Sequence, residues 1–227
     1  MSEPDPNPGC HRRKLCARCL RPQNACICRW AFPVLSAVEV LILQHPLEVA
    51  NPKGSARLLH LSLPRSRLVS GESFEAGELQ ALLHAPWPAQ QADNVAAPPR
   101  RQPVLLYPEF AGEAGVTGAA PVPLDEELLH APARLRLVVL DATWRKSRKM
   151  LHLNPLLQTL PRLALQDVPA SRYLIRKAHL PHQLSTLEAT CHALAQLDGG
   201  AEKFAPLLRA FDGLVAQQAR YFRPASG

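Results

Sequence analysis

The sequence predicts an α/β protein with a mostly parallel sheet and helices on both faces. Short runs of Val, Ile and Leu alternate along the chain with segments of helical periodicity, the pattern typical of such a sheet. At 227 residues, 47% of them hydrophobic, the chain is long enough to bury one sizeable core. Five of the six cysteines precede Trp30. We therefore expect two parts, a cysteine-rich N-terminal segment (residues 1–30) and an α/β domain (residues 31–227).

The N-terminal segment contains CARCLRPQNACIC, which holds Cys16, Cys19, Cys26 and Cys28. A C-x2-C pair directs two thiolates at one ion, and a second pair completes a closed, tetrahedral zinc site. Disulfides are the alternative, but a cytoplasmic compartment disfavours them, and Cys26 and Cys28 are too close for independent bridges. Four thiolates leave no position for water, so these cysteines predict a structural rather than a catalytic zinc ion. Cys191, in a helical run, is expected to be a small buried side chain.

The α/β domain begins with the first of five apolar runs that are expected to be strands, because Val, Ile and Leu dominate them. These runs are residues 36–43, 67–70, 103–107, 134–140 and 162–165. Helical periodicity is seen at 55–63, 76–84 and 143–153, and the C-terminal part is predicted to form one helix from about Leu184 and another from about Ala201 to Phe222. Two stretches rich in Ala, Pro and Gly, 86–103 and 111–123, are predicted to be long loops or a linker.

Several functional classes are excluded or made less favourable by the sequence. No apolar run approaches the roughly 20 residues that span a bilayer, so no membrane association is expected. The start MSEPDPNPGC has acids and prolines where a signal peptide would be basic and apolar, which predicts a cytoplasmic protein. The Gly-rich fingerprints of dinucleotide and P-loop sites are missing. A net charge of +7 favours a polyanionic partner, although charge alone is a weak signal.

Polar side chains cluster after the predicted strands, where α/β folds bind ligands. His45 and Glu48 follow the first strand, Tyr107 and Glu109 the third, and Asp141 the fourth. The other candidates are Thr143, Trp144, Tyr173, Arg176, Ser185, Thr186 and Glu188.

Structural explanations compete with a role in binding for several of these residues. Ser185 and Glu188 fit the S-x-x-E capping box at the start of a helix. Asp141 and Thr143 fit a pair of caps for the helix that follows. Trp144 could instead be a buried core residue, and His45 could serve only to end a strand. The sequence leaves these alternatives open.

The helix at 143–153 is unusually basic. Four cationic side chains occur at the i, i+3, i+4 and i+7 positions of one face: Arg145, Arg148, Lys149 and His152. No acid lies between Asp141 and Asp167, whereas a solvated helix face usually mixes charges. The pattern therefore favours phosphate binding.

Taken in order, these blocks resemble the DTW-domain family, whose bacterial members are tRNA-uridine aminocarboxypropyltransferases. The Asp-x-Thr-Trp signature is Asp141, Thr143 and Trp144. The resemblance also covers the four-cysteine stretch, HPLE at 45–48, LLYP at 105–108, SRYLIRKA at 171–178 and STLEA at 185–189, and thus nearly the whole chain. One block departs from the family: NPKGSARLL stands where an Asn-Thr-Gly-like turn is expected, which leaves the roles of Asn51 and Ser55 open.

The resemblance implies a transferase that moves the 3-amino-3-carboxypropyl group of S-adenosylmethionine to N3 of a tRNA uridine, typically in the variable loop, and releases methylthioadenosine. It also implies a SPOUT-like fold with a trefoil knot near the C-terminal strands. Asp141 would be the general base or an orienting acceptor, with water or Glu188 as the alternative proton acceptor.

The remaining roles follow from the same resemblance. Arg176 would bind the donor's carboxylate, and Trp144 would stack on the adenine or the target base. The other residues expected to hold S-adenosylmethionine are Leu106, Tyr107, Pro108, Thr143, Tyr173, Ser185, Thr186 and Glu188. The residues expected to bind tRNA phosphates are Arg145, Lys146, Arg148 and Lys149.

Two other functions fit the residues. One is an S-adenosylmethionine-dependent RNA methyltransferase on the same fold, and the other is a zinc-containing RNA-binding protein without catalytic activity. The sequence leaves the oligomeric state open, with a slight preference for a monomer.

Overall fold

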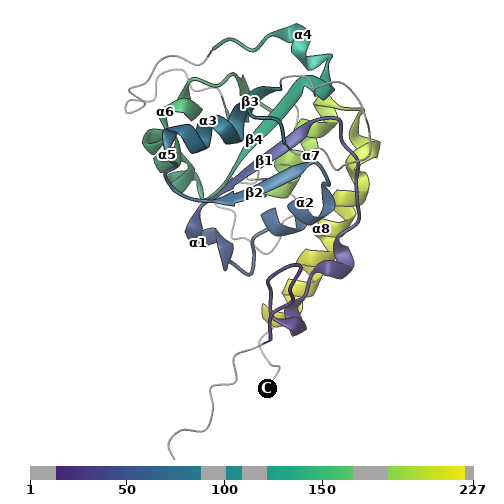
Figure 1. Ribbon diagram of the computed structural model, residues 1–227. Helices are drawn as coiled ribbons and strands as arrows, with labels where there is room; N and C mark the ends of the chain where they lie inside the picture. The colour runs from purple at the N-terminus through teal and green to yellow at the C-terminus, as the bar shows by residue number, and fades with distance from the viewer. Residues whose placement is uncertain (1–13, 88–100, 109–121, 166–183, 223–227) are drawn as a thin grey trace, which may run out of the picture.

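The computed structural model describes residues 14–87, 101–108, 122–165 and 184–222, which fold around a five-stranded sheet (Figure 1). The strands are β1 (Glu39–Gln44), β2 (Ser66–Ser70), β3 (Gln102–Leu106), β4 (Leu135–Asp141) and β5 (Arg162–Leu163). Their order is β2-β1-β4-β3-β5, and every pairing is parallel. The predicted fold class is therefore confirmed.

The two central strands are buried on both faces. All of β1 and nearly all of β4 are buried, which explains why each contains a continuous apolar run, at residues 40–43 and 137–140, rather than alternating polar and apolar residues. In the register between them, Gln44 lies opposite Asp141, so both strands end at the same edge of the sheet. That edge positions the polar residues of the site.

Three helices cover one face of the sheet: α2 (Ala56–Ser62), α7 (Thr186–Leu197) and α8 (Ala201–Phe222) (Figure 1). The opposite face carries α3 (Ala76–His84), α5 (Trp144–Leu153) and α6 (Pro155–Gln158). Alternate residues of β1 enter the two cores, Val40 and Ile42 on the α7 face and Leu41 and Leu43 on the α5 face. Helices on both faces were predicted, and the structure confirms them.

Several predicted boundaries shift. The expected strand at 36–43 begins only at Glu39, because Ser36 and Ala37 donate hydrogen bonds to Asp198 at the end of α7 instead of joining the sheet. Pro103 lies within β3 rather than in the predicted loop at 86–103, most of which is outside the described residues.

Six single-turn elements among the described residues were not predicted, because one turn is too short to show periodicity; one of them is α6. The other five are α1 (Pro46–Val49), α4 (Glu126–Leu129) and the 3₁₀ turns η1 (Gln23–Ala25), η2 (Cys28–Trp30) and η3 (Pro132–Arg134). Among the described helices, none has the length and apolar character needed to cross a membrane.

The cysteine segment packs directly on the α7 and α8 side of the molecule. Cys19 and Ile27 are buried in the same core as Phe211 and Leu214 of α8. Gly213 of α8 meets the ring of Trp30 so closely that an added Cβ would lie 2.5 Å from it. A small residue is therefore required where this segment contacts the helix.

Candidate functional site

The four cysteines of the N-terminal segment form one cluster. Their sulfur atoms all lie within 4.8 Å of one another, with 3.6 Å between Cys16 and Cys28 and 3.7 Å between Cys19 and Cys26. A tetrahedral zinc ion with Zn–S bonds of about 2.3 Å separates its sulfur ligands by about 3.8 Å, so the geometry fits. Backbone N–H groups, first that of Cys19 and then that of Arg18, lower the pKa of Cys16 to about 6, whereas burial first and then the hydrogen bond with Cys16 raise the pKa of Cys28 to about 12. The sulfur spacing, rather than the thiol pKa values, therefore supports a metal site.

Cys191 lies elsewhere, buried in α7. Desolvation raises the pKa of this thiol far above its ordinary value. The expectation of a small buried side chain is confirmed.

Asp141 ends β4 with its carboxylate held from two sides. Gln44 Nε2 donates to Oδ2 at 2.8 Å, and Thr186 Oγ1 donates to Oδ1 at 2.6 Å. The sheet register places Gln44, and the start of α7 places Thr186. Only 6% of Asp141 is exposed, so the carboxylate is fixed in one orientation at the edge of the sheet. The alternative that Asp141 caps α5 is wrong, since these donors belong to β1 and α7.

An aromatic pair stands beside this carboxylate. Tyr107 follows β3, which neighbours β4, and its ring stacks on Trp144 with 5.2 Å between centroids and 15° between planes. Tyr107 is 7% exposed, whereas Trp144 is 45% exposed. The interpretation of Trp144 as a core residue is therefore wrong. A half-exposed indole on a buried ring is a surface on which a base can stack.

The N-cap residue of α5 does not make the side-chain hydrogen bond that the sequence predicts. Thr143 occupies the N-cap position, but its side chain makes no capping hydrogen bond and is exposed. The hydroxyl of Ser147 donates instead to the Trp144 carbonyl and lies 3.5 Å from the Tyr107 hydroxyl. The expected cap by Thr143 is thus wrong, and its expected role in cofactor binding stays a prediction.

The start of α7 is a complete capping box. Ser185 Oγ accepts from the Glu188 N–H at 3.2 Å, and a Glu188 carboxylate oxygen accepts from the Ser185 N–H at 2.8 Å. The capping interpretation is therefore confirmed. Its consequence for the site is that Thr186, the next residue, points its hydroxyl at Asp141.

His45 has two structural partners rather than a free ring. Its Nδ1 accepts from the Leu47 N–H at 3.1 Å, so Nε2 carries the proton and donates to Glu72 at 2.9 Å. Lys149 also donates to Glu72, at 2.9 Å. Lys149 first, and then His45, lower the pKa of Glu72 below its ordinary value. His45 therefore ends β1 and caps α1.

The basic helix is partly neutralised by acids that are distant in sequence. Lys146 binds the buried Glu48 at 2.8 Å, and Lys149 binds Glu72 at 2.9 Å. No acid lies between Asp141 and Asp167 in the sequence, so the acids that pair with Lys146 and Lys149 come from other elements. Arg145 and Arg148 are exposed. Phosphate binding by the four cations stays a prediction.

Several expected site residues are brought together and others are not described. Leu106 is the last residue of β3, and Tyr107 and Pro108 follow it, next to the end of β4 and its Asp141 edge. Tyr173, Arg176 and Glu109 lie outside the described residues.

Sequence reasoning missed two groups. Gln44 was overlooked as part of a strand, although a polar residue ending an apolar run beside His45 was an available signal. Glu72 gave no comparable signal, because its partners are on other elements. Asn51 and Ser55 also have structural partners: Asn51 donates to Glu48 at 2.7 Å, and Ser55 accepts from the Leu187 N–H at 3.2 Å.

Comparison with known proteins gives a consistent result. The DTW domain family matches residues 13–219. The tRNA-uridine aminocarboxypropyltransferase 2 of Drosophila melanogaster is 30% identical, over 92% of this chain and 76% of that protein. The protein of the same name from Mus musculus is 27% identical, over 92% of this chain and 65% of its own length. The tRNA-uridine aminocarboxypropyltransferase A of Arabidopsis thaliana is 25% identical, over 94% and 84%. No solved structure matches the chain significantly.

Proposed function

This chain belongs to the DTW domain family, and we propose that it is a tRNA-uridine aminocarboxypropyltransferase that uses S-adenosylmethionine. The relatives that carry this name are eukaryotic, so the resemblance is broader than the bacterial members that the sequence motifs suggested. The acceptor is N3 of a tRNA uridine, in the variable loop, and methylthioadenosine is the second product.

The observation that carries the proposal is the position of the signature residues. Asp141 is fixed by Gln44 and Thr186, and Trp144 presents a half-exposed ring beside it. Both lie at the carboxyl edge of a parallel sheet, where α/β folds bind their ligands. A binding surface without catalysis has no need of an oriented carboxylate beside a stacking ring.

In the proposed reaction, Asp141 accepts the proton of uridine N3 or orients the uridine through it. As that proton leaves, N3 attacks the carbon gamma to the donor's carboxylate, the N–C bond forms, and the C–S bond of the sulfonium breaks. The sulfonium charge is lost with methylthioadenosine, so charge and atoms balance. The hydrogen bonds from Gln44 and Thr186 orient the carboxylate of Asp141 at the end of β4, which supports its role as base or orienting acceptor. Water and Glu188 remain the alternative acceptors.

The donor would lie along the ends of β3 and β4. Leu106, Tyr107 and Pro108 would contact the adenosine, and Trp144 would stack on the adenine or on the target base. Thr143, Tyr173, Ser185, Thr186 and Glu188 complete the set, with Arg176 on the aminocarboxypropyl carboxylate. Ser185 and Glu188 already bind each other, so they support the site mainly by orienting α7.

The tRNA would lie across α5. Arg145, Lys146, Arg148 and Lys149 are the phosphate ligands of this proposal. Arg145, Arg148 and Lys149 are exposed, and Lys146 and Lys149 also bind acids of other elements. Extrusion of the uridine exposes N3, and it costs less free energy in a loop than in a duplex.

Further properties belong to the same proposal. The fold is SPOUT-like with a trefoil knot near the C-terminal strands; residues 166–183, which connect β5 to α7, lie outside the described residues. The cysteine cluster holds a structural zinc ion, which its sulfur spacing supports. A cytoplasmic location and a monomeric state complete the proposal, together with the division into an N-terminal segment and a catalytic domain.

A label-partition assay tests the reaction. Purified protein and unmodified tRNA are incubated with S-adenosylmethionine labelled either in the methyl group or in the aminocarboxypropyl chain. Chain label in RNA with release of methylthioadenosine is expected. Methyl label in RNA would instead indicate a methyltransferase on the same fold. No label, with active enzyme controls, would favour an RNA-binding protein without catalysis.

A further inference from the structure

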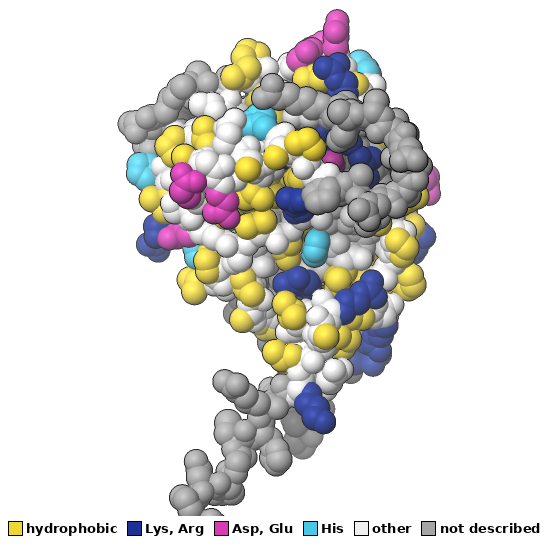
Figure 2. All heavy atoms as spheres, in the orientation of Figure 1, with side chains coloured by type: hydrophobic (Ala, Val, Ile, Leu, Met, Phe, Trp, Pro, Cys, Tyr) yellow, Lys and Arg dark blue, Asp and Glu magenta, His cyan; other side chains and the backbone are white. Residues whose placement is uncertain are grey.

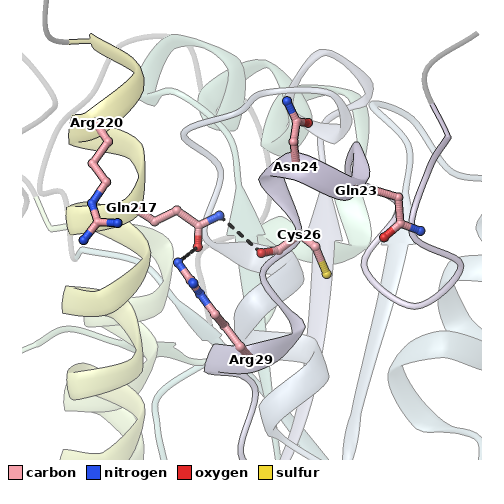
Figure 3. Close-up of a pocket in the computed structure, with 6 residues that line it drawn as sticks. All are labelled: Gln23, Asn24, Cys26, Arg29, Gln217 and Arg220. Atoms are coloured by element: carbon pink, nitrogen blue, oxygen red, sulfur yellow. Dashed lines mark hydrogen bonds between the residues drawn. The ribbon is translucent and has the colours of Figure 1, made fainter. Parts of the chain in front are cut away.

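A polar cavity of about 570 Å³ lies between the cysteine segment and the C-terminal end of α8, away from the strand-end site (Figure 3). Its lining is Gln23, Asn24, Cys26, Arg29, Gln217 and Arg220. Among the described residues, the lining thus comprises three amide side chains, two guanidinium groups and one cysteine, with no carboxylate.

The surface around this cavity is basic. Residues 14–38 contain four cations and no acid: Lys14, Arg18, Arg21 and Arg29. Residues 213–220, near the C-terminal end of α8, contain Arg220 and no acid. Figure 2 shows Lys and Arg side chains over the lower part of the visible face, while the Asp and Glu side chains described there lie in the upper part. We refer to residues 14–30 together with 213–220 as the basic surface.

Structural roles account for only part of this charge. Arg29 donates to Gln217 at 2.9 Å and lies 4.7 Å from the centre of the Trp30 ring, so it helps to hold the segment on α8. A zinc ion with four thiolates has a net charge of about −2, which two cations would offset. The five cations of the basic surface exceed that requirement. An excess of positive charge remains, and it favours a polyanion.

The basic surface is connected to the strand-end site by hydrogen bonds. Arg21 donates to the carbonyls of Pro52 and Gly54, at 2.7 Å each. The next residue, Ser55, accepts from the Leu187 N–H, and Thr186 donates to Asp141 at 2.6 Å. This chain of contacts links the basic surface to the strand-end site within the fold.

We propose that the basic surface binds the phosphate backbone of the tRNA at a distance from the target uridine, and that the cavity accepts one phosphate or nucleotide of it. The proposal rests on the assignment of tRNA as the substrate. Guanidinium groups bind phosphate oxygens, and amide side chains bind phosphates, sugars or base edges, so the lining matches this ligand. Such contacts position a nucleic acid without reading its sequence.

Replacement of Arg220 by glutamine tests the proposal. Arg220 is exposed at the end of α8, so Arg220→Gln is expected to leave the melting temperature and zinc content unchanged. The Kd for unmodified tRNA should rise roughly tenfold at low salt, and the salt dependence should fall by about one unit of slope. In turnover, KM for tRNA should rise while kcat at saturating tRNA stays the same. A second variant, Arg29→Gln, should act in the same direction.

Arg134→Gln is the matched control, since it removes the same charge from an exposed residue of η3, just before β4 begins. If Arg220→Gln and Arg29→Gln, both folded, bind tRNA with the same Kd and salt slope as Arg134→Gln, the proposal is overturned. A minimal hairpin with only the target loop should bind the wild type and Arg220→Gln equally. Equal weakening for hairpin and tRNA would contradict a contact distant from the uridine.

The two proposals fail in different ways. If the wild type transfers no label but Arg220→Gln still weakens tRNA binding, the proposed reaction is refuted and tRNA binding by the basic surface is supported. If the wild type transfers chain label and Arg220→Gln binds tRNA as Arg134→Gln does, the proposed reaction is supported and tRNA binding by the basic surface is refuted.

Discussion

At the scale of single residues, the site depends on how one carboxylate is held. Asp141 accepts hydrogen bonds from an amide and a hydroxyl, neither of which carries a charge. Both donors orient the carboxylate at the end of β4. The arrangement suits a group that must accept or orient the N3 proton.

Asp141→Asn is expected to lower the rate of label transfer by about 10²- to 10⁴-fold, because the amide keeps the shape but cannot accept the proton as a carboxylate does. The rate is measured at saturating tRNA and S-adenosylmethionine. Thr186→Val should lower kcat as well, since it removes a donor that orients Asp141. Thr186→Ser, which keeps the hydroxyl, is the control. Wild-type turnover in Asp141→Asn would exclude Asp141 as the base.

Trp144→Ala is expected to weaken binding of tRNA or S-adenosylmethionine by roughly 1–3 kcal/mol, the range for loss of a stacked base. Stability should change less than for a buried aromatic residue, because Trp144 is 45% exposed. Equilibrium binding of each ligand and thermal melting provide the measurements. Trp144→Phe, which retains a ring against Tyr107, should recover much of the affinity. Unchanged affinity for both ligands in Trp144→Ala would argue against stacking.

At the scale of elements, α7 connects the site to the opposite end of the sheet. Its first turn places Thr186 on Asp141, and its C-terminal residue Asp198 binds Ser36, Ala37 and Lys203. Burial alone would raise the pKa of Asp198, but Lys203, the Ala37 N–H and the Ser36 hydroxyl together lower it below the ordinary 3.8. The helix is therefore held at both ends by side-chain hydrogen bonds.

Asp198→Asn should reveal a pH-dependent contribution to stability. Because the folded pKa is lowered, the ionised carboxylate stabilises the fold above the unfolded value of 3.8, and this stabilisation is lost as pH falls through the folded pKa. Urea unfolding should show the wild type more stable than Asp198→Asn at neutral pH, with the difference shrinking below about pH 4. Glu202→Gln, at an exposed acid of α8, is the control. A difference that stays constant with pH would contradict the prediction.

At the scale of the whole molecule, the cysteine segment is part of the main core. Ile27 is fully buried, and Gln217 of α8 binds Arg29, Trp30 and the Cys26 carbonyl. The segment that carries the four cysteines is thus also attached to the last helix. We therefore expect removal of a bound zinc ion to lower the free energy of unfolding more than it lowers turnover.

Removal of zinc, or Cys16→Ser, is expected to lower stability by at least about 2 kcal/mol, on the order of 4–8 °C for a chain of this size. Turnover at saturating substrates and low temperature should persist. Bound zinc and the melting temperature are measured together. Cys191→Ala, outside the cluster, should leave the zinc content unchanged. Metal-free protein that melts at the wild-type temperature and binds tRNA equally well would refute a structural role.

Local patterns in the sequence were sufficient for much of the architecture. Apolar runs predicted all five strands, and helical periodicity predicted the long helices, because both depend on neighbouring residues along the chain. The C-x2-C spacing predicted the cysteine cluster for the same reason. Asp141 was identified as a strand-end residue, and the S-x-x-E pattern predicted the capping box.

The tertiary structure alone decided which partners these residues have. Gln44 is 97 residues and Thr186 is 45 residues from Asp141, and Lys146 and Lys149 are neutralised by acids of other elements. Trp144 could not be recognised as a half-exposed stacking ring until Tyr107 was placed beside it. Hydrogen bonds, ion pairs and stacking act over a few ångströms of space whatever the separation in sequence. Only the packing of the sheet and helices therefore determines them.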